Sequence, residues 1–337
     1  MNFVKTNQVN LEITTTNKCN LNCTYCFEGL DKNKLKHSNL THKDFDFDGV
    51  KNVDFWGGEP TLNSKLILDV MKVHPNLNYH IYSNGYNTSQ ILILVHKILR
   101  IIKKENLNIQ ISYDGKVITD LERKTFNSTK SSDNILKTFD ELYKMDINLS
   151  MKATLPVKHF NKMNQVYDEF VELHRKYGVV YAPTIDTTDV PTKDDIKEFI
   201  KQDMMIAKKE LQNYKEFKNF IFSWNLLDEE RIICSAGKKT FCYNSEGTGY
   251  PCHGFMYREN SDIITTEFIN NLKLERPEKC KDCVATYCLS CPANAFFKSK
   301  DSDPYKRWND VYDSDFCELF KEHGKINRAL IYGISKL

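Results

Sequence analysis

The sequence predicts an α/β protein with a parallel sheet, followed by a small cysteine-rich region. Strand-like and helix-like segments alternate from residue 9 to about residue 200. Such alternation favours a parallel sheet covered by helices. The eleven cysteines are unequally distributed, with three at 19–26, none from 27 to 233, and eight from 234 to 317. An odd cysteine count in a chain without a secretory signal favours metal or redox use over a disulfide framework.

The strands and helices follow from the hydrophobic periodicity. Strands are predicted at 9–16, 51–58, 78–85, 108–115, 147–155 and 179–185. Helices are predicted at 63–74, 90–105, 132–145, 161–176 and 193–214, with a connecting helix at 215–233 and a last helix at 315–334. The first crossover, 31–49, is charged and predicts a loop or a short helix. Periodicity alone leaves an open sheet and a barrel as alternatives.

Composition limits the classes of partner. The chain has 337 residues, 41% of them apolar, and a formal net charge of +2. This charge balance gives no reason to expect a nucleic-acid surface or a polybasic membrane segment. The N-terminus lacks the pattern of a signal peptide, and the longest apolar stretch is too short to span a bilayer. We therefore expect a cytoplasmic protein that binds neither nucleic acid nor membrane.

Four chemically distinctive motifs each follow a predicted strand: CNLNCTYC at 19–26, GGEP at 57–60, SNG at 83–85 and YDG at 113–115. The carboxyl ends of parallel strands carry functional groups in both open sheets and barrels. Three thiolates leave one iron of a four-iron cube open, whereas eight are enough to close two further cubes. A zinc knuckle with a missing ligand, or unrelated thiols, are the alternatives for the first group.

The CxxxCxxC spacing of Cys19, Cys23 and Cys26 after the first strand, with GGEP after the second, resembles the radical S-adenosylmethionine (radical SAM) superfamily. The resemblance covers about residues 9–200. It implies a partial (β/α)6 TIM-like barrel over 1–205, a [4Fe–4S] cluster with one open iron, and S-adenosylmethionine bound to that iron. It also implies reductive cleavage of S-adenosylmethionine to a 5′-deoxyadenosyl radical that abstracts hydrogen from a substrate.

The resemblance also implies the residues that contact S-adenosylmethionine. Gly57, Gly58 and Glu59 match the segment beside the methionyl amine, where glycines allow close approach and Pro60 fixes the turn. Tyr25 matches the aromatic residue beside the adenine. The expected ribose and carboxylate contacts are Ser83, Ser112, Asp114 and Arg123. Ordinary turn chemistry is the alternative for Ser83 and Asp114, and the segment around Arg123 aligns in more than one way.

The C-terminal cysteines resemble the SPASM extension, which implies a connecting helix at 206–233, an iron–sulfur-binding SPASM domain at 234–320 and a C-terminal helix at 321–337. One auxiliary [4Fe–4S] cluster would be held by Cys234, Cys242, Cys252 and Cys291. The other would be held by Cys280, Cys283, Cys288 and Cys317. A zinc ribbon is the alternative, although its two CxxC pairs are unusually close together. Cys242 has two alternatives: a buried apolar thiol or a free thiol that donates hydrogen.

His253 follows Cys252 and is the candidate proton acceptor; a histidine bonded to backbone is the alternative. Sulfatase maturases have aspartate at this position, which counts against formylglycine formation. The expected activity is oxidative modification of a peptide or protein, by a thioether or other cross-link or by side-chain oxidation. The rivals are a peptide epimerase with Cys242 as hydrogen donor, an enzyme acting on a small metabolite, and a non-catalytic metal-binding module.

Three kinds of partner are expected: the peptide or protein substrate, a reductant such as flavodoxin or ferredoxin, and a separate leader-peptide recognition protein. The last is expected because many relatives begin with a winged-helix domain, whereas the first predicted strand here begins within ten residues of the N-terminus. The alternative is a substrate that binds directly in the barrel.

Overall fold

The computed structural model describes residues 9–26, 38–186, 189–222, 235–237, 239–256, 278–285, 293, 296, 299–309 and 316–336. The chain divides into two compact units that do not follow its order. The first comprises 1–150 with 235–272, and the second 151–234 with 273–337. The predicted domain boundaries at 205, 233 and 320 divide the chain in sequence order and stay predictions.

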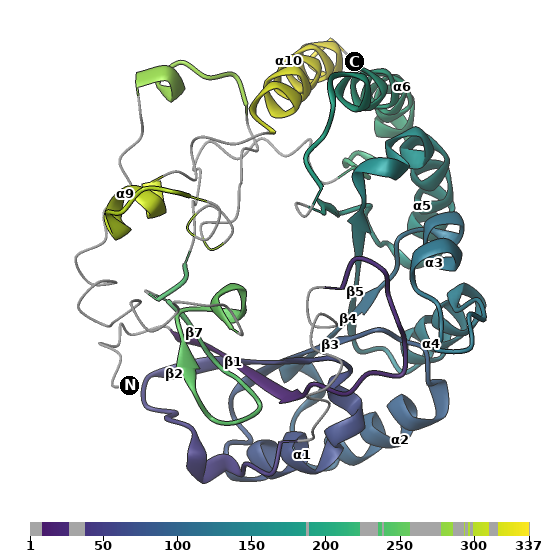
Figure 1. Cartoon of the computed structure of the whole chain (residues 1–337). Coiled ribbons are helices and arrows are strands. Elements are labelled where there is room, and N and C mark those ends of the chain that lie inside the picture. The colour runs from purple at the N-terminus through teal and green to yellow at the C-terminus, as the bar shows by residue number, and fades with distance from the viewer. Residues whose placement is uncertain are drawn as a thin grey trace. The chain divides into compact units, whose positions relative to one another are not determined.

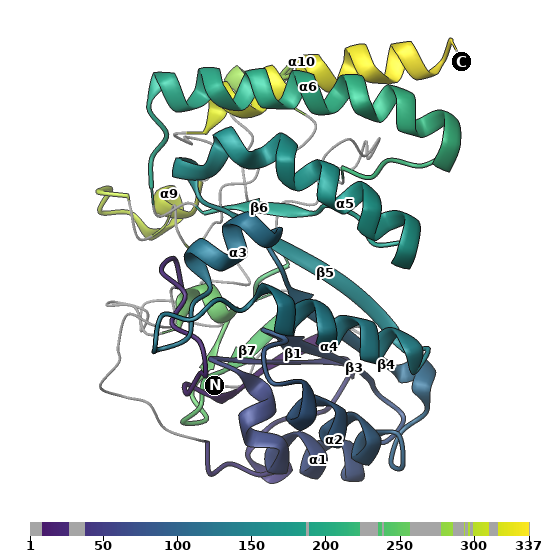
Figure 2. The same cartoon turned by 90° about the vertical axis from the view of Figure 1, so that its right-hand side faces the viewer.

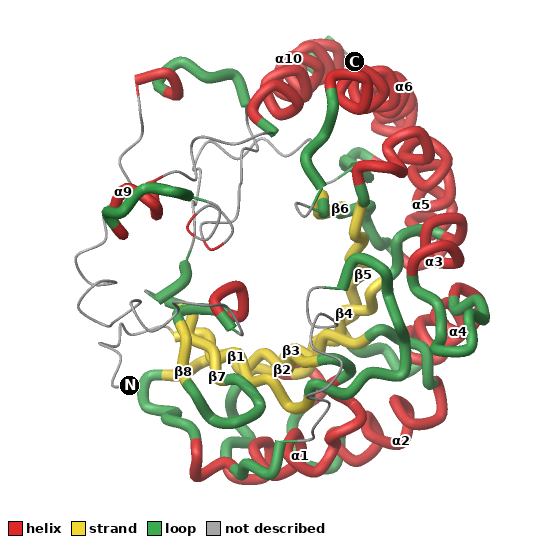
Figure 3. The backbone as a smooth tube through the Cα atoms, in the orientation of Figure 1, coloured by secondary structure: helices red, strands yellow, loops and turns green. Residues whose placement is uncertain are grey.

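The first unit is built on a mainly parallel sheet, drawn as arrows in Figure 1 and in yellow in Figure 3. Its strands are β1 (Val9–Thr16), β2 (Val50–Gly57), β3 (Asn78–Ser83), β4 (Leu107–Ser112), β7 (Thr240–Tyr243) and β8 (Gly249–Tyr250). Their order is β4-β3-β2-β1-β7-β8, and only β7 and β8 pair antiparallel. The parallel α/β prediction is therefore confirmed, whereas β7 and β8 were not predicted.

The two faces of this sheet differ in chemistry because side chains alternate along each strand. One face carries buried apolar residues, among them Ile13, Phe55, Ile81 and Ile109. Figure 1 shows α1 (Ser64–Val73) and α2 (Thr88–Ile98) on one side of the sheet. The opposite face, which we call the polar face, carries Glu12, Thr14, Asp54, Trp56, His80, Tyr82, Gln110 and Ser112.

The helices of the first unit begin close to their predicted starts, but one of them ends early. The helix expected over 90–105 is α2, which ends at Ile98; a short 3-10 turn, Lys104–Asn106, precedes β4. Lys103 has an extended backbone, which ends any continuation of the helix. The structure adds α3 (Lys116–Glu122), which was not predicted, and α4 (Ser132–Lys144) matches its prediction. In the described part of the first crossover, only His42–Asp44 forms a 3-10 turn, as expected.

The second unit contains the end of β5 (Asn148–Leu155), which pairs parallel with β6 (Pro183–Ile185), and, among its described residues, four helices. These helices are α5 (Met163–Tyr177), α6 (Lys193–Phe217), α9 (Pro304–Asn309) and α10 (Cys317–Ile334). Figure 2 shows α6 and α10 side by side. His323 of α10 bonds Asp203 of α6 at 2.8 Å, with both side chains buried. Among the described helices, none has the length and apolarity needed to cross a membrane.

The connecting helix expected at 215–233 does not begin at 215. Residues 215–217 complete α6, and Lys218 then adopts a left-handed backbone with φ of 56° that caps the helix. Ile221 and Phe222 instead donate their backbone N–H groups to the buried carboxylate of Glu210. The remainder of that prediction, 223–233, lies outside the described residues.

The packing of α10 predicts different outcomes for two glycines on the same helix. A Cβ at Gly324 would collide with the backbone carbonyl of Val284, whereas one at Gly333 would meet only the Leu211 side chain at 3.2 Å. We expect Gly324→Ala to destabilise the second unit by about 1–3 kcal/mol through overpacking. Gly333→Ala, the matched control, should be neutral or gain up to about 1 kcal/mol of helix propensity. Thermal unfolding measures both, and equal midpoints would contradict the prediction.

Candidate functional site

The site begins where the ends of β1 and β2 approach each other closely. Gly58 donates its N–H to the Thr16 carbonyl at 2.8 Å, and Glu59 donates to the Lys18 carbonyl at 2.8 Å. A Cβ at Gly57 or Gly58 would collide with these backbone carbonyls, and Gly57 has a φ of 141°. Only glycine therefore permits this approach. The glycine pair thus holds the segment leading into the cysteines against the GGEP turn.

Glu59 joins the GGEP turn to the end of β3. Its carboxylate accepts the Ser83 hydroxyl at 2.9 Å, the Asn84 backbone N–H at 2.7 Å and the Thr61 hydroxyl at 2.6 Å. Burial raises the pKa of Glu59, and these hydrogen bonds oppose the rise. Ser83 is fully buried and also accepts the Gly85 N–H, so its hydroxyl is used within the chain. Pro60 is buried in the first turn after Glu59.

Backbone and side-chain bonds fix the cysteine loop at both sides. Asn22 and Thr24 donate their N–H groups to the carbonyls of Lys124 and Glu122, and the Thr24 hydroxyl bonds the Glu122 carboxylate. At the other side, the Asn84 amide lies 3.5 Å from the Cys19 sulfur and 2.7 Å from the Asn20 side-chain oxygen. The loop after β1 is therefore tied to the segments that follow β3 and α3.

A buried ion pair supports the same loop from the end of β4. Arg123 donates to both carboxylate oxygens of Asp114, at 2.7 and 3.2 Å, and the Tyr25 hydroxyl donates to the same carboxylate. The guanidinium also lies over the Tyr25 ring, 5.3 Å from its centroid. The fork expected to bind a ligand carboxylate is thus occupied by Asp114. Ser112, on the polar face of β4, is half-buried.

The three thiols of the loop are near enough to influence one another. Burial raises the pKa of Cys19 to about 12, with further contributions from Glu59, Cys23 and Cys26. Burial also raises the pKa of Cys23 to about 11, and Arg123 opposes that rise. Thiolates are the form that binds iron, and bound cations supply the charge that stabilises them. This set of three half-buried thiols fits a metal cluster.

The spacing of these thiols bears on the kind of metal. Across the described residues, no three His, Cys, Asp or Glu side chains converge as they would around a single ion. In a four-iron cube each thiolate binds a different iron, so its ligands need not converge on one point. The geometry of the loop is therefore compatible with a cube.

The polar face holds two carboxylate–histidine pairs. Glu12 of β1 accepts the His253 backbone N–H at 3.1 Å and lies 3.0 Å from its Nδ1. Asp54 of β2 lies 2.9 Å from Nδ1 of His80 on β3. Glu12, Asp54 and His80 are register partners across three adjacent strands. The Glu12 carboxylate thus holds His253 through both its backbone N–H and its imidazole ring.

The stacked rings of Tyr82, Trp56 and His253 lie between the two carboxylate–histidine pairs. Trp56 stacks on Tyr82 with centroids 4.0 Å apart and on His253 with centroids 4.6 Å apart. The indole N–H of Trp56 is buried and has no hydrogen-bond partner among the described residues. Because Trp56 directly precedes Gly57, the ring stack joins the GGEP segment to the residue after Cys252.

The later cysteines are placed only in part. Cys242 lies in β7, fully buried, with its sulfur 3.5 Å from the Met256 sulfur, and Cys252 is half-buried. In the second unit, Cys280 and Cys283 share one turn and Cys317 begins α10. Cys234, Cys288 and Cys291 lie outside the described residues. The two proposed ligand sets therefore stay predictions.

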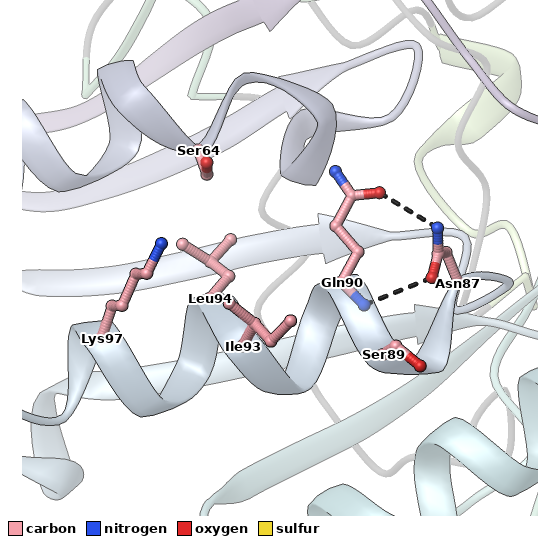
Figure 4. Close-up of a pocket in the computed structure, with 7 residues that line it drawn as sticks. All are labelled: Ser64, Asn87, Ser89, Gln90, Ile93, Leu94 and Lys97. Atoms are coloured by element: carbon pink, nitrogen blue, oxygen red, sulfur yellow. Dashed lines mark hydrogen bonds between the residues drawn. The ribbon is translucent and has the colours of Figure 1, made fainter.

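A separate cavity lies away from these groups. It lies near the start of α2 and has a volume of about 320 Å³. Figure 4 shows the residues that line it: Ser64, Asn87, Ser89, Gln90, Ile93, Leu94 and Lys97. Asn87 caps the helix by accepting the Gln90 N–H at 3.2 Å. None of the residues predicted to bind cofactor or metal lines this cavity.

The motifs predicted at the carboxyl ends of β1 to β4 meet in the structure. Four residues of the site were not predicted: Asn84, the middle residue of the SNG motif, and Glu12, Asp54 and His80 on the polar face. The sequence signal for Glu12, Asp54 and His80 was present, because they are polar residues at alternate positions of apolar strands. The partnership of Glu12 with His253 had no such signal, since 241 residues separate them.

Comparison with known proteins gives a family match over the first part of the chain. Residues 13–166 match the family model described as the Radical SAM superfamily. An uncharacterised protein of Methanocaldococcus jannaschii is 30% identical over 183 residues, covering 50% of this chain and 59% of that protein. A GTP 3′,8-cyclase of Clostridium botulinum is 26% identical over 185 residues, covering 50% of this chain and 53% of the cyclase. These alignments span little more than half the length of either relative.

A solved structure extends the shared fold to nearly the whole chain. It is described as native anSMEcpe with bound AdoMet and Cp18Cys peptide, and it matches with a TM-score of 0.70. The match covers 98% of this chain and 99% of the other, at 18% identity. At that identity the likeness concerns the fold alone.

The ion pair of Asp114 and Arg123 makes a testable stability prediction. Asp114→Asn leaves the buried guanidinium without a counter-charge, which typically costs about 3–5 kcal/mol. The matched control is Asp133→Asn, which breaks the exposed pair with Lys116 and should cost no more than about 1 kcal/mol. Thermal unfolding and hydrogen exchange of residues 19–26 measure the difference. Unchanged protection of the loop in Asp114→Asn would contradict the supporting role of the pair.

Proposed function

Because residues 13–166 match the Radical SAM superfamily model, we propose that this chain is a radical SAM enzyme that oxidatively modifies a peptide or protein. Such a domain implies a [4Fe–4S] cluster and S-adenosylmethionine as cofactors. The product would be a cross-link, such as a thioether, or an oxidised side chain. The observation that carries the proposal is the convergence of the Cys19–Cys26 loop, the GGEP turn and the ends of β3 and β4.

Cys19, Cys23 and Cys26 are the proposed ligands of the cluster with the open iron. When bound, the cluster and S-adenosylmethionine together supply the radical that removes hydrogen from a substrate. The chain's own part is to fix the loop, through the bonds from Asn84 to Cys19 and from the end of α3 to Asn22 and Thr24. A preorganised loop limits the ways in which the cluster and cofactor can sit.

The proposed contacts to S-adenosylmethionine fall into two kinds. Side chains that the chain already uses internally act as positioning residues; these are Glu59, Ser83, Asp114 and Arg123. Groups that remain for direct contact are the Tyr25 ring, the Gly57–Gly58–Pro60 turn and the half-buried Ser112. This division refines the resemblance, which treats all of these residues as contacts.

The auxiliary clusters are also part of the proposal. One would be bound by Cys234, Cys242, Cys252 and Cys291, the other by Cys280, Cys283, Cys288 and Cys317. Both would be [4Fe–4S] clusters that accept electrons. The proposed external reductant is flavodoxin or ferredoxin. A separate protein is the proposed recognition factor for a leader peptide. The fold shared with anSMEcpe over 98% of the chain supports a SPASM-type second part.

His253 is the proposed proton acceptor beside the second group of cysteines. Glu12 lies 3.0 Å from Nδ1 of His253 and also accepts its backbone N–H, which orients the imidazole. Stacking on Trp56 fixes the ring plane. A substituted His253 should therefore impair turnover of the substrate and leave the cysteine loop intact.

A second candidate is a radical SAM enzyme that acts on a nucleotide or another small metabolite. The observation in its favour is the match of half the chain to GTP 3′,8-cyclases. Against it, the structure with a bound peptide shares the fold over almost the full chain, whereas the match to the botulinum cyclase covers only 53% of that enzyme.

Two substrate assays separate these candidates. The reduced enzyme with S-adenosylmethionine is incubated with a short Cys- or Gly-rich peptide encoded beside its gene, or with GTP. We expect the peptide to lose the mass of two hydrogen atoms and GTP to remain unchanged, as read by mass spectrometry. A cyclised product of GTP with an unmodified peptide would favour the second candidate.

Iron analysis tests the cluster assignment. Anaerobically purified protein should contain about twelve irons per chain, the content of three cubes. Replacing Cys19, Cys23 and Cys26 together by Ala should remove about four irons and abolish cleavage of S-adenosylmethionine. The matched control replaces Cys280 and Cys283 by Ala, which should lower iron but leave the first cluster in place. Zinc in the purified protein would contradict the auxiliary clusters, and persistent cleavage in the triple variant would overturn the first assignment.

A further inference from the structure

The second carboxylate–histidine pair of the polar face has no role in the function proposed so far. Asp54 holds Nδ1 of His80 at 2.9 Å across neighbouring strands. The Asp54 side chain is only 10% exposed, whereas the His80 side chain is 39% exposed. With Nδ1 engaged, Nε2 is the nitrogen left to another group. A buried carboxylate behind an open imidazole is the arrangement of a general base and its orienting residue.

The surroundings of His80 favour its proton-bearing form. The hydrogen bond from Asp54 raises the pKa of His80, and partial burial opposes the rise. Beyond Asp54, β1 contributes the carboxylate of Glu12, and the register partner on β4 is the uncharged Asn108. On β3 itself, Tyr82 lies edge-on to the imidazole, 6.3 Å between centroids. Burial, then Asp54 and Glu12, raises the pKa of Tyr82, so the phenol stays neutral.

Another histidine pair shows what a structural role looks like in this chain. His42 lies 3.0 Å from Asp69, where a 3-10 turn meets α1, and there the carboxylate is the more exposed partner, at 37% against 25%. Asp69 also accepts the His42 backbone N–H, which ties the turn to the helix. Within the described part of the chain, Asp54 contacts the His80 ring and accepts no hydrogen bond from the His80 backbone, and in this pair the histidine is the more exposed partner. The position of His80 is therefore suited to meeting a ligand.

We propose that His80 is a catalytic proton acceptor on the polar face, with Asp54 as its positioning residue. The inference rests on the proposed function, because it needs an oxidised substrate. In a two-electron oxidation the substrate gives up a hydrogen atom, an electron and a proton. The hydrogen atom would go to the 5′ carbon of the adenosyl group, and the electron would go to an oxidised iron–sulfur cluster. The proton leaves its bond to the substrate and binds Nε2 of His80, while the bonding pair stays on the substrate.

The location of His80 connects this role to the rest of the site. Its neighbour Tyr82 stacks on Trp56, and Trp56 directly precedes the Gly57–Gly58 turn proposed to contact the cofactor. His80 and His253 stand at opposite ends of the Tyr82–Trp56 ring pair, each held by its own carboxylate. The polar face thus carries two imidazoles, each oriented by its own carboxylate.

Three variants of the full-length, reconstituted enzyme test the inference: His80→Gln, Asp54→Asn and the control His42→Gln. Loss of a general base typically lowers the rate 10²–10⁴-fold. We expect His80→Gln to lower kcat for the modified peptide at least about 100-fold with little change in KM. Iron content and binding of S-adenosylmethionine should match those of the unsubstituted enzyme. His42→Gln should leave kcat unchanged.

The pH profile gives a readout that a purely structural role would not move. The base acts when neutral, so activity falls on acidification through the pKa of His80. Asp54→Asn removes the bond that raises this pKa, and the fall should therefore move to lower pH. The same shift should appear when the His80 imidazole is titrated by NMR, in protein labelled at the histidine Cε1 carbons and assigned through the signal lost in His80→Gln.

Two results would overturn the inference: kcat of His80→Gln within about threefold of the unsubstituted value, or an NMR titration of His80 that Asp54→Asn leaves unchanged. Failure of the proposed function looks different. In that case the unsubstituted enzyme cleaves S-adenosylmethionine without modifying peptide, and the NMR titration still decides whether Asp54 controls the proton on His80. An NMR shift together with normal turnover in His80→Gln would assign the proton-accepting role to another group.

Discussion

The close approach of two backbones is the constraint on which the site depends. Gly57 and Gly58 lie against the carbonyls of residues 16–18, and no side chain fits between them. This contact fixes the direction in which the chain leaves β1 and therefore the position of Cys19. It also aims Glu59 at the end of β3, where Ser83 and Asn84 bond its carboxylate. The cysteine loop is thus positioned by the sheet and does not depend on the thiols alone.

The sequence predicted the parallel α/β fold and the edge of the sheet at which the motifs meet, because both follow from local periodicity. It did not predict β7, whose four residues are too few for a periodic signal and which pairs with a strand more than two hundred positions earlier. The pairing of Glu12 with His253 depends on the same long-range contact. Helix ends were missed where a single backbone conformation decides them, as at Lys218.

Burying charge is costly, and here each buried carboxylate of the site has partners. An unpaired ion in a protein interior costs several kcal/mol. Asp114 has Arg123 and the Tyr25 hydroxyl, Glu59 has hydroxyls and a backbone N–H, and Glu12 and Asp54 have imidazoles. The partners differ in kind. Guanidinium and hydroxyl groups hold geometry, whereas an imidazole can also exchange a proton near neutral pH.

The two kinds of partner occupy different parts of the site: one kind lies in the loops after the strands and the other on the strands themselves. Loop residues that follow β1 to β4 hold the cysteines and the glycine turn, and their carboxylates are bonded to groups that keep one protonation state. Residues within β1 to β3, on the polar face, carry the groups whose protonation can change. Because odd positions of the same strands form the apolar core, a change at His80 or Asp54 leaves the packing of Tyr79, Ile81 and Phe55 in place. Chemistry on the polar face is therefore separable from folding, which is the property that lets such a sheet serve different substrates on one framework.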